Sequence, residues 1–192
     1  MTRILLINGH PDPDPRRFCA ALADVYAAAA VEAGHEVRHI DVGAQDFPLI
    51  RTADAFAGPA TAPSILAAQD AVLWCEHLVI VHPLWQGGAP ALLKGFLEQV
   101  FRYGFAIPAP GTGSLGRGLL SGRSARLIVT MGMPAAVYAL AFGAFGTRAL
   151  ERGLFRLCGF APVRRTLFGA VDQPASRQRM LRRVRRLGER GR

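Results

Sequence analysis

The sequence predicts an α/β fold: a doubly wound sheet of five parallel strands with helices on both faces. Strand-like and helix-like segments alternate along almost the whole chain, which is typical of parallel strands joined by crossover helices. The composition agrees, because 51% of the 192 residues are hydrophobic and 19% are charged, as expected for strands buried on both faces. A chain of this length suits one well-buried domain and is short for two.

The first half of the chain alternates strand, helix, strand, helix. The strand candidates are residues 3–8 (RILLIN) and 36–41 (EVRHID). The helix candidates are residues 18–33, which are rich in alanine and stop at Gly34, and residues 64–74. Glycine at that position favours a helix end, because it adopts the left-handed conformation at little cost.

The second half continues the alternation and completes the sheet. Five parallel strands with helices on both sides favour the flavodoxin-like order 2-1-3-4-5, in which ligands bind outside the carboxyl ends of strands 1 and 3. The remaining strand candidates are residues 78–82 (LVIVH), 125–130 (ARLIVT) and 163–168. The remaining helix candidates are residues 90–101, 138–158 (with a break expected at Gly143 or Gly146) and 176–187.

Most of the net charge of +9 lies at the carboxyl end of the chain. Residues 176–192 hold eight arginines and one glutamate, a net +7, so the remainder is nearly neutral. A protein that binds nucleic acid non-specifically would spread cations over one face, so we expect no nucleic-acid partner. We therefore divide the chain into a domain of residues 1–175 and a basic amphipathic C-terminal helix or tail of residues 176–192.

This C-terminal segment has two interpretations. Met180, Leu181, Val184 and Leu187 recur at helical spacing, so the segment forms an amphipathic helix with a narrow apolar stripe. In the first, the stripe packs on the domain and the arginines are solvated. In the second, the arginines also make a weak contact with an anionic membrane surface.

Three cysteines, at positions 19, 75 and 158, lie far apart and form no C-x-x-C motif. This usage suits a reducing compartment, so we expect a cytoplasmic protein. Residues 127–147 carry no charge and are long enough to span a membrane, but their glycines and proline favour a buried strand, a turn and a helix. We expect no metal site, because His10 and His82 at the ends of neighbouring strands have no third ligand at a suitable spacing.

Residues 111–116 (GTGSLG) match the spacing of a dinucleotide-binding fingerprint. That fingerprint binds pyrophosphate because its glycines form the turn between a strand and a helix. Here no strand candidate precedes the glycines and no helix candidate follows them. We interpret the match as accidental.

The segments that follow strands 1, 3 and 4 look unlike ordinary turns. The first, residues 8–19 (NGHPDPDPRRFC), brings His10 and Arg17 to a helix start that suits a phosphate. An alternative is that Asp12 and Asp14 simply cap the helix.

The other two segments offer a planar surface and polar donors. After Pro83, the residues Leu84 and Trp85 precede two glycines that allow a ligand to approach closely. Alternatively, Trp85 belongs to the core or to a dimer interface. After strand 4, Gly132 presents backbone donors and Tyr138 a hydroxyl that stabilises negative charge during a reaction. Cys19 is either a nucleophile at a helix start or a packing residue.

Together these motifs resemble the flavodoxin-like NAD(P)H:quinone oxidoreductase family, of the DT-diaphorase type. The resemblance runs from ILLINGHP through HPLWQGGAPALLKGFLEQVF and GFA to TMGMP and CGF. It implies that His10, Phe18 and Cys19 bind the flavin phosphate and ribityl, that Pro83, Leu84 and Trp85 contact the isoalloxazine, and that Thr130, Gly132 and Tyr138 lie at the far edge of the ring.

The chain departs from the family at two positions. Arg17 stands where relatives often have serine or threonine, which suggests an ionic contact to the phosphate. Many relatives have a histidine one or two helical turns after the tyrosine, whereas residues 141–146 (AFGAFG) contain none and Phe145 lies at or near that place. Proton relay by a tyrosine–histidine pair is therefore not expected.

The resemblance implies a flavin-dependent enzyme that reduces quinones or related electrophiles with NAD(P)H by ping-pong hydride transfer, in which Tyr138 is the catalytic residue. FMN is slightly favoured over FAD, because no adenine-binding segment is evident. It also implies a homodimer, with residues 103–107 and 111–116 near the partner. The alternative is a flavin-fold regulatory subunit that binds a membrane transport partner.

Overall fold

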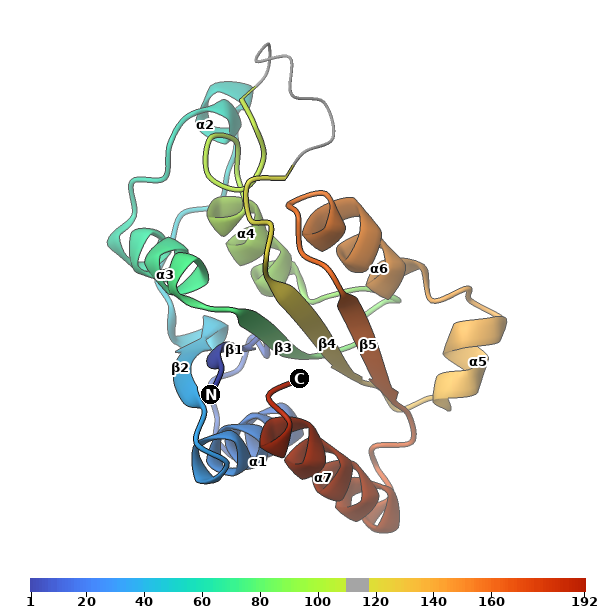
Figure 1. Cartoon of the computed structure of the whole chain (residues 1–192). Helices are drawn as coiled ribbons and strands as arrows, with labels where there is room; N and C mark the ends of the chain where they lie inside the picture. Colours follow the sequence, from blue (N-terminus) through green and yellow to red (C-terminus); the bar gives the residue numbers. More distant parts are fainter. Residues whose placement is uncertain (110–117) are drawn as a thin grey trace.

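The computed structural model describes residues 1–109 and 118–192. Its five parallel strands form one sheet in the order β2-β1-β3-β4-β5, which confirms the predicted topology (Figure 1). The predicted strands have the observed bounds, except that β3 gains one residue at each end and β4 one at its start. The strands are β1 (Arg3–Asn8), β2 (Glu36–Asp41), β3 (His77–Pro83), β4 (Ser124–Thr130) and β5 (Val163–Phe168). The fingerprint-like residues 111–116 lie outside the described residues.

The helices agree with the prediction along most of the described chain, with two short additions and one break. Helix α2 and the turn η1 were not expected, because five and three residues are too short to show a helical period. The predicted helix 138–158 begins earlier and is broken where Gly143 and Ala144 adopt positive φ angles of 59° and 51°. The elements are α1 (Phe18–Glu32), η1 (Val42–Ala44), α2 (Ala53–Ala57), α3 (Pro63–Trp74), α4 (Ala91–Val100), α5 (Ala135–Leu140), α6 (Phe145–Arg148), the π-helical segment η2 (Ala149–Arg156) and α7 (Pro174–Glu189).

The sheet separates two hydrophobic layers. Helices α3 and α4 lie on one face of the sheet, and α1 and α7 lie on the other (Figure 1). Alternate residues of each central strand point to opposite faces, so that Leu5 and Ile7 belong to the layer of α3 and α4, and Ile4 and Leu6 to the layer of α1 and α7. All four side chains are fully buried. Burial on both faces explains why the central strands are continuous apolar runs rather than alternating patterns.

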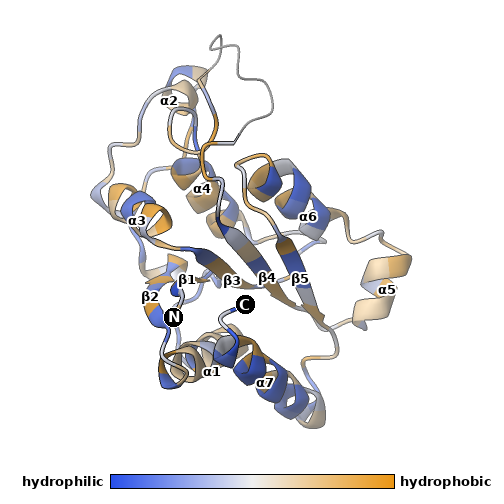
Figure 2. Cartoon of the chain, viewed as in Figure 1, coloured by the Kyte–Doolittle hydropathy of each residue, from blue (hydrophilic) through white to orange (hydrophobic). Residues whose placement is uncertain are grey.

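The basic C-terminal segment forms α7, which begins at Pro174 and packs along α1. Its narrow apolar stripe is buried, because Met180 and Val184 contact the layer that contains Tyr26. Gly188 lies so close to α1 that an added Cβ would be 2.4 Å from the Tyr26 carbonyl oxygen. The rest of α7 is strongly hydrophilic (Figure 2), and Arg185 pairs with Glu32 at the end of α1 at 2.6 Å.

The uncharged residues 127–147 form most of β4, a turn, α5 and the start of α6, so the predicted strand and turn are followed by two short helices rather than one. No helix within residues 1–109 and 118–192 combines the length and the hydrophobicity of a membrane span.

The core contains a histidine that makes stability depend on pH. His82 is fully buried in β3, and desolvation lowers its pKa from 6.5 to about 4. As the pH falls below 6.5, His82 becomes protonated in the unfolded chain before it does in the folded protein. The stability that the neutral histidine contributes is therefore full above pH 6.5 and is lost as the pH falls toward 4. From pH 6.5 to 5 the single group costs up to about 2 kcal/mol. His77 acts in the same direction, since burial lowers its pKa to about 4.

We therefore expect the protein to have a markedly smaller free energy of urea unfolding at pH 5 than at pH 7. The pH dependence should weaken in His82→Gln and persist in His39→Gln, whose side chain is 35% exposed. Equal free energies of unfolding at the two pH values would contradict the assignment of His82 as a buried neutral group.

Candidate functional site

The segments that follow β1, β3 and β4 meet outside the carboxyl ends of these strands. The His10 and Trp85 rings contact edge to face, with centroids 6.0 Å apart. The Leu84 backbone N–H donates to the Thr130 carbonyl at 2.7 Å. The Thr130 hydroxyl lies 3.4 Å from the Cys19 sulfur. The structure therefore brings together residues that the sequence placed in three separate motifs.

The segment between β1 and α1 is held by its own polar side chains. The Asn8 amide joins it to β2 by donating to Asp41 at 2.8 Å, and the Asn8 oxygen accepts from the His10 backbone N–H at 3.2 Å. Asp12 accepts from the Asp14 backbone N–H and from the Arg17 side chain, and these two hydrogen bonds lower the pKa of its carboxyl group. The result is a folded loop that ends at the first residue of α1.

The start of α1 has the properties of an anion site. Its N-cap residue, Arg17, makes no capping hydrogen bond through its side chain, and the first turn contains no acidic residue. The free N–H groups of the first turn and the helix dipole then favour a bound phosphate. The side chain of Arg17 does not add an unpaired charge here, because it pairs with Asp12 at 2.5 Å. Phe18, at the first helical position, packs beside Arg177, whose guanidinium lies 5.0 Å from the ring centroid.

A tight turn presents Trp85 at the edge of the sheet. Trp85 and Gly88 exchange two backbone hydrogen bonds of 3.0 Å, and the two residues between them, Gln86 and Gly87, have φ angles of 48° and 81°. Positive φ at both central residues is the geometry of a type I′ turn, and glycine adopts it readily. Trp85 is 50% exposed, so it is not the core residue that one interpretation of the sequence proposed. Pro83 and Leu84, which lead into this turn, are both partly buried.

The buried side chain of Tyr138 stabilises this turn by a hydrogen bond. The residue is 2% exposed, and its hydroxyl donates to the Gly87 carbonyl at 3.0 Å. The same oxygen accepts from the Thr147 backbone N–H at 3.3 Å. Gly146 packs directly on the turn, where an added Cβ would lie 2.1 Å from the Gly87 carbonyl oxygen. The Tyr138 hydroxyl therefore donates its proton in a hydrogen bond that stabilises the turn.

The contacts that stabilise the turn continue to a buried ion pair that could not be predicted from the sequence. The Thr147 hydroxyl accepts from Arg165 on β5 at 3.1 Å. Arg165 pairs at 2.7 Å with Glu151 of η2, a residue that is only 6% exposed. Glu151 also pairs with Arg156 at 2.7 Å. Because Arg165 is far from Thr147 in sequence, no motif or spacing could have linked these residues before the fold was known.

We expect Tyr138→Phe to loosen the turn without disturbing the fold. The change leaves the Gly87 carbonyl and the Thr147 N–H without their partner, which costs about 1 kcal/mol. The free energy of urea unfolding should fall by that amount. Tyr103→Phe is the matched control, because Tyr103 lies near the opposite end of the sheet; equal stability in the two variants would argue against the supporting role of Tyr138.

The remaining candidates have ordinary structural surroundings. Burial raises the pKa of the Cys19 thiol to about 11, which opposes a role as a nucleophile at neutral pH. Gly132 follows β4 and would carry a Cβ 3.3 Å from the Asp172 carboxylate. Phe145, near the place of the family histidine, is 75% exposed. Within residues 1–109 and 118–192, no group of three or more histidine, cysteine, aspartate or glutamate side chains is placed to hold a metal ion.

Comparisons with known proteins agree with this architecture. A family model described as a flavodoxin-like fold matches residues 2–190. The chain is 31% identical over 172 residues to an uncharacterized NAD(P)H oxidoreductase of Haemophilus influenzae, a match that covers 87% of this chain and 83% of that protein. It is 31% identical over 155 residues to an FMN-dependent NADH:quinone oxidoreductase of Ruegeria pomeroyi, covering 69% and 72%.

Other relatives are longer than this chain, and one solved structure is close to it in size. A ribosyldihydronicotinamide dehydrogenase-like protein of Penicillium crustosum is 30% identical over 158 residues, which are 68% of this chain and 57% of that protein. The crystal structure of Smu.1420 from Streptococcus mutans superposes with a TM-score of 0.83 at 26% identity and covers 98% of this chain and 99% of that one. With a family match over nearly its whole length and a Haemophilus relative aligned over most of both chains, this protein belongs to the flavodoxin-like family that includes NAD(P)H oxidoreductases, as its motifs predicted.

Proposed function

We propose that this protein is an FMN-dependent oxidoreductase that reduces quinones with NAD(P)H. One observation carries the proposal: the segment between β1 and the uncapped start of α1 contacts, through His10, a half-exposed tryptophan that follows β3. That is the position where a sheet of this order binds its ligand. The name of the Ruegeria relative, which specifies FMN, NADH and quinone, supports the same chemistry.

The residues present fit a flavin mononucleotide. The start of α1, with His10, Arg17, Phe18 and Cys19 around it, supplies backbone donors for the phosphate. At the other end, the backbone N–H groups of Gln86 and Gly87 make no hydrogen bond within the described part of the chain. A polar heterocycle against Trp85 would give such groups a partner.

We assign the ring contacts by the same logic. Pro83, Leu84 and Trp85 would hold one side of the ring, while Thr130, Gly132 and Tyr138 would lie at its far edge. FMN held by these residues would supply hydride-transfer chemistry between NAD(P)H and a quinone. The chain itself fixes the turn, because Tyr138 and Gly146 contact Gly87 and the Thr147 N–H donates to the Tyr138 hydroxyl. Such preorganisation lowers the ordering cost of binding.

A titration of flavin-free protein with FMN tests the proposal. We expect the flavin fluorescence to be quenched on binding and the dissociation constant to rise at least about fivefold in Trp85→Ala, since aromatic stacking contributes about 1 kcal/mol or more. Leu73→Ala is the control, because Leu73 is also about half exposed, at 51%, but lies on α3. Failure of the wild-type chain to take up FMN would refute the proposal.

We further propose that the enzyme acts as a homodimer. Large apolar side chains near the site are exposed, among them Leu140 (85%), Phe142 (53%) and Phe145 (75%), and such a patch is typical of a protein interface. Light scattering should therefore give twice the mass of the chain. A fully active monomer would contradict this proposal.

We place the enzyme in the cytoplasm, which suits three free, buried cysteines. We also propose a weak contact between the arginine face of α7 and anionic membranes, where quinones reside. Co-sedimentation with anionic vesicles at low salt, and its loss at high salt, would support the contact, whereas protein that stays in the supernatant at low salt would exclude it. The relatives named above do not support the alternative of a regulatory subunit.

A further inference from the structure

A small pocket lies between helix α7 and the edge strand β5. Phe168 and Gly169 line it from the end of β5, and Arg179 and Arg183 line it from α7. Phe168 belongs to the hydrophobic layer of α1 and α7, so the pocket lies on that face of the sheet. Its volume is about 230 Å³, which is below the range of pockets for drug-sized ligands and suits a smaller molecule.

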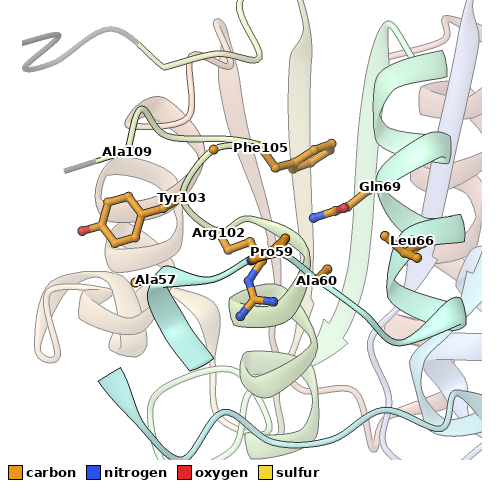
Figure 3. A pocket seen from close by; sticks show the side chains of 10 residues that line it. Ala57, Pro59, Ala60, Leu66, Gln69, Arg102, Tyr103, Phe105 and Ala109 are labelled. Carbon is orange, nitrogen blue, oxygen red and sulfur yellow. The ribbon is translucent and has the colours of Figure 1, made fainter. Parts of the chain in front are cut away.

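This pocket is separate from the flavin site and from the expected dimer interface. Arg185 of α7 pairs with Glu32 of α1. Because an α-helix has about 3.6 residues per turn, Arg183 lies on the opposite side of α7 from Arg185, away from α1 and the proposed phosphate site at its start. The wider space of about 430 Å³ beside Arg102 and Tyr103 (Figure 3) lies where the partner subunit is expected, so the partner would cover it.

Two arginines are held beside this pocket by contacts of their own. A terminal nitrogen of Arg179 donates to the Ser176 hydroxyl at 2.9 Å. The Arg183 guanidinium lies 5.8 Å from the Phe168 ring centroid, within the range of a cation–π contact. The two arginines are four residues apart on α7, where like charges are neighbours and repel each other. A bound anion would remove this repulsion.

Two further arginines add positive charge on the same face of the sheet. Arg126 of β4 lies two residues before Ile128 of the α1 and α7 layer, and it pairs in register with Arg164 of β5. Arg126 is 8% exposed, and its Nε atom is buried without a hydrogen-bond partner. Desolvation lowers the pKa of the Arg126 guanidinium, and the positive charges of Arg164 and Arg183 add to this shift. Within residues 1–109 and 118–192, no ion pair is formed by Arg126, Arg164, Arg179 or Arg183. Four cations without a carboxylate partner favour a bound anion.

We propose that this pocket binds a small phosphate anion that carries two or more negative charges, with Arg179 and Arg183 as its direct partners. A guanidinium fork matches a phosphate group through two parallel hydrogen bonds. Diphosphate offers one phosphate group to each of the two guanidinium groups, whereas Arg126 and Arg164 would act on it through their charge alone. This proposal does not depend on the flavin chemistry.

Calorimetric titration of the purified, FMN-loaded protein with inorganic diphosphate tests the site, at about 0.15 M salt so that diffuse attraction is screened. Citrate is the comparison, because it carries a similar charge on carboxylates and has a larger carbon body. We expect diphosphate to bind at least ten times more tightly than citrate and to leave FMN bound. Absence of diphosphate binding, equal affinities for the two anions, or release of FMN would each overturn the proposal.

Two variants locate the binding. Arg179→Gln and Arg183→Gln each remove one direct partner, so diphosphate affinity should fall at least tenfold in both. Both side chains are exposed, so the fold should be kept. Arg182→Gln is the matched control, because Arg182 is an exposed neighbour on α7 that does not line the pocket. Unchanged affinity in Arg179→Gln and Arg183→Gln, or an equal loss in Arg182→Gln, would show attraction to net charge alone and overturn the proposal.

The same phosphate chemistry is offered by a free anion and by a lipid headgroup. Sedimentation with vesicles that contain phosphatidic acid or phosphatidylserine at the same mole fraction separates the two sources. A preference for phosphatidic acid that is lost in Arg183→Gln would identify a headgroup phosphate as the ligand, and equal binding to both vesicles would identify the free anion. A preference that Arg183→Gln retains would place the phosphate contact outside this pocket and contradict the proposal.

Discussion

Replacing Gly146 with alanine is expected to reduce FMN affinity at least about a hundredfold, the largest effect of any single methyl group in this site. An alanine Cβ would lie 2.1 Å from the Gly87 carbonyl oxygen and 2.6 Å from the Gly88 Cα. Both neighbours are backbone atoms of the turn that carries Trp85, so the clash cannot be relieved by rotating a side chain. The turn must move, and the hydrogen bond from Tyr138 to Gly87 must lengthen or break.

Gly153 provides the matched control for this prediction. It lies in η2, and no atom would come within 4 Å of an added Cβ. Gly153→Ala should therefore leave FMN affinity unchanged and stabilise the fold by up to about 1 kcal/mol, because alanine favours helical conformations. Gly146→Ala should instead cost about 1–3 kcal/mol through overpacking. Equal FMN dissociation constants for the two variants would show that the turn does not need its contact with α6.

Replacing Glu151 with glutamine is expected to give the largest loss of stability, about 3 kcal/mol, because it leaves two arginines facing a neutral group. Glu151 is 6% exposed, and its partners Arg165 and Arg156 approach within 2.7 Å. The partial exposure of the arginines, 26% and 56%, places the effect at the lower end of the range for buried pairs. Arg165 also donates to Thr147, so the FMN site should loosen as well.

The measurement is the free energy of urea unfolding, together with FMN affinity, in Glu151→Gln and in the control Glu98→Gln. Glu98 pairs with Lys94 on the surface of α4, and exposed pairs of this kind contribute at most about 0.5 kcal/mol. In the double variant Glu151→Met with Arg165→Met, much of the lost stability should return, because neither charge is left buried. A Glu151→Gln variant as stable as Glu98→Gln would contradict the supporting role of this pair.

The sheet could be predicted from sequence because its signal is local and strong. The central strands are apolar runs, and the helices between them end at residues such as Gly34, which has a φ angle of 82°. The short elements α2 and η1 could not be predicted in this way, since they are much shorter than the window of about 11 residues over which a helical period can be recognised. The break near Gly143 was anticipated, but the start of α5 at Ala135 was not.

The candidate site could be predicted only for residues that lie next to the carboxyl ends of the strands. Sequence placed Trp85, Thr130 and Tyr138 beside strands that meet in space. It could not show that the Tyr138 hydroxyl would donate to the Gly87 carbonyl rather than face an open pocket, because that hydrogen bond depends on how the segment after β4 folds back. The same holds for Arg17, which seemed free for a phosphate and is instead paired with Asp12.

Anaerobic half-reactions test the central claim most directly. The FMN-loaded protein is mixed without oxygen with NADH or NADPH, the nicotinamide is removed by desalting, and a soluble benzoquinone is then added. We predict that one of the reductants bleaches the visible flavin band, and that the quinone restores it with no nicotinamide present. A band that neither NADH nor NADPH bleaches, or that the quinone fails to restore, would contradict the assignment of this protein as an FMN-dependent quinone reductase.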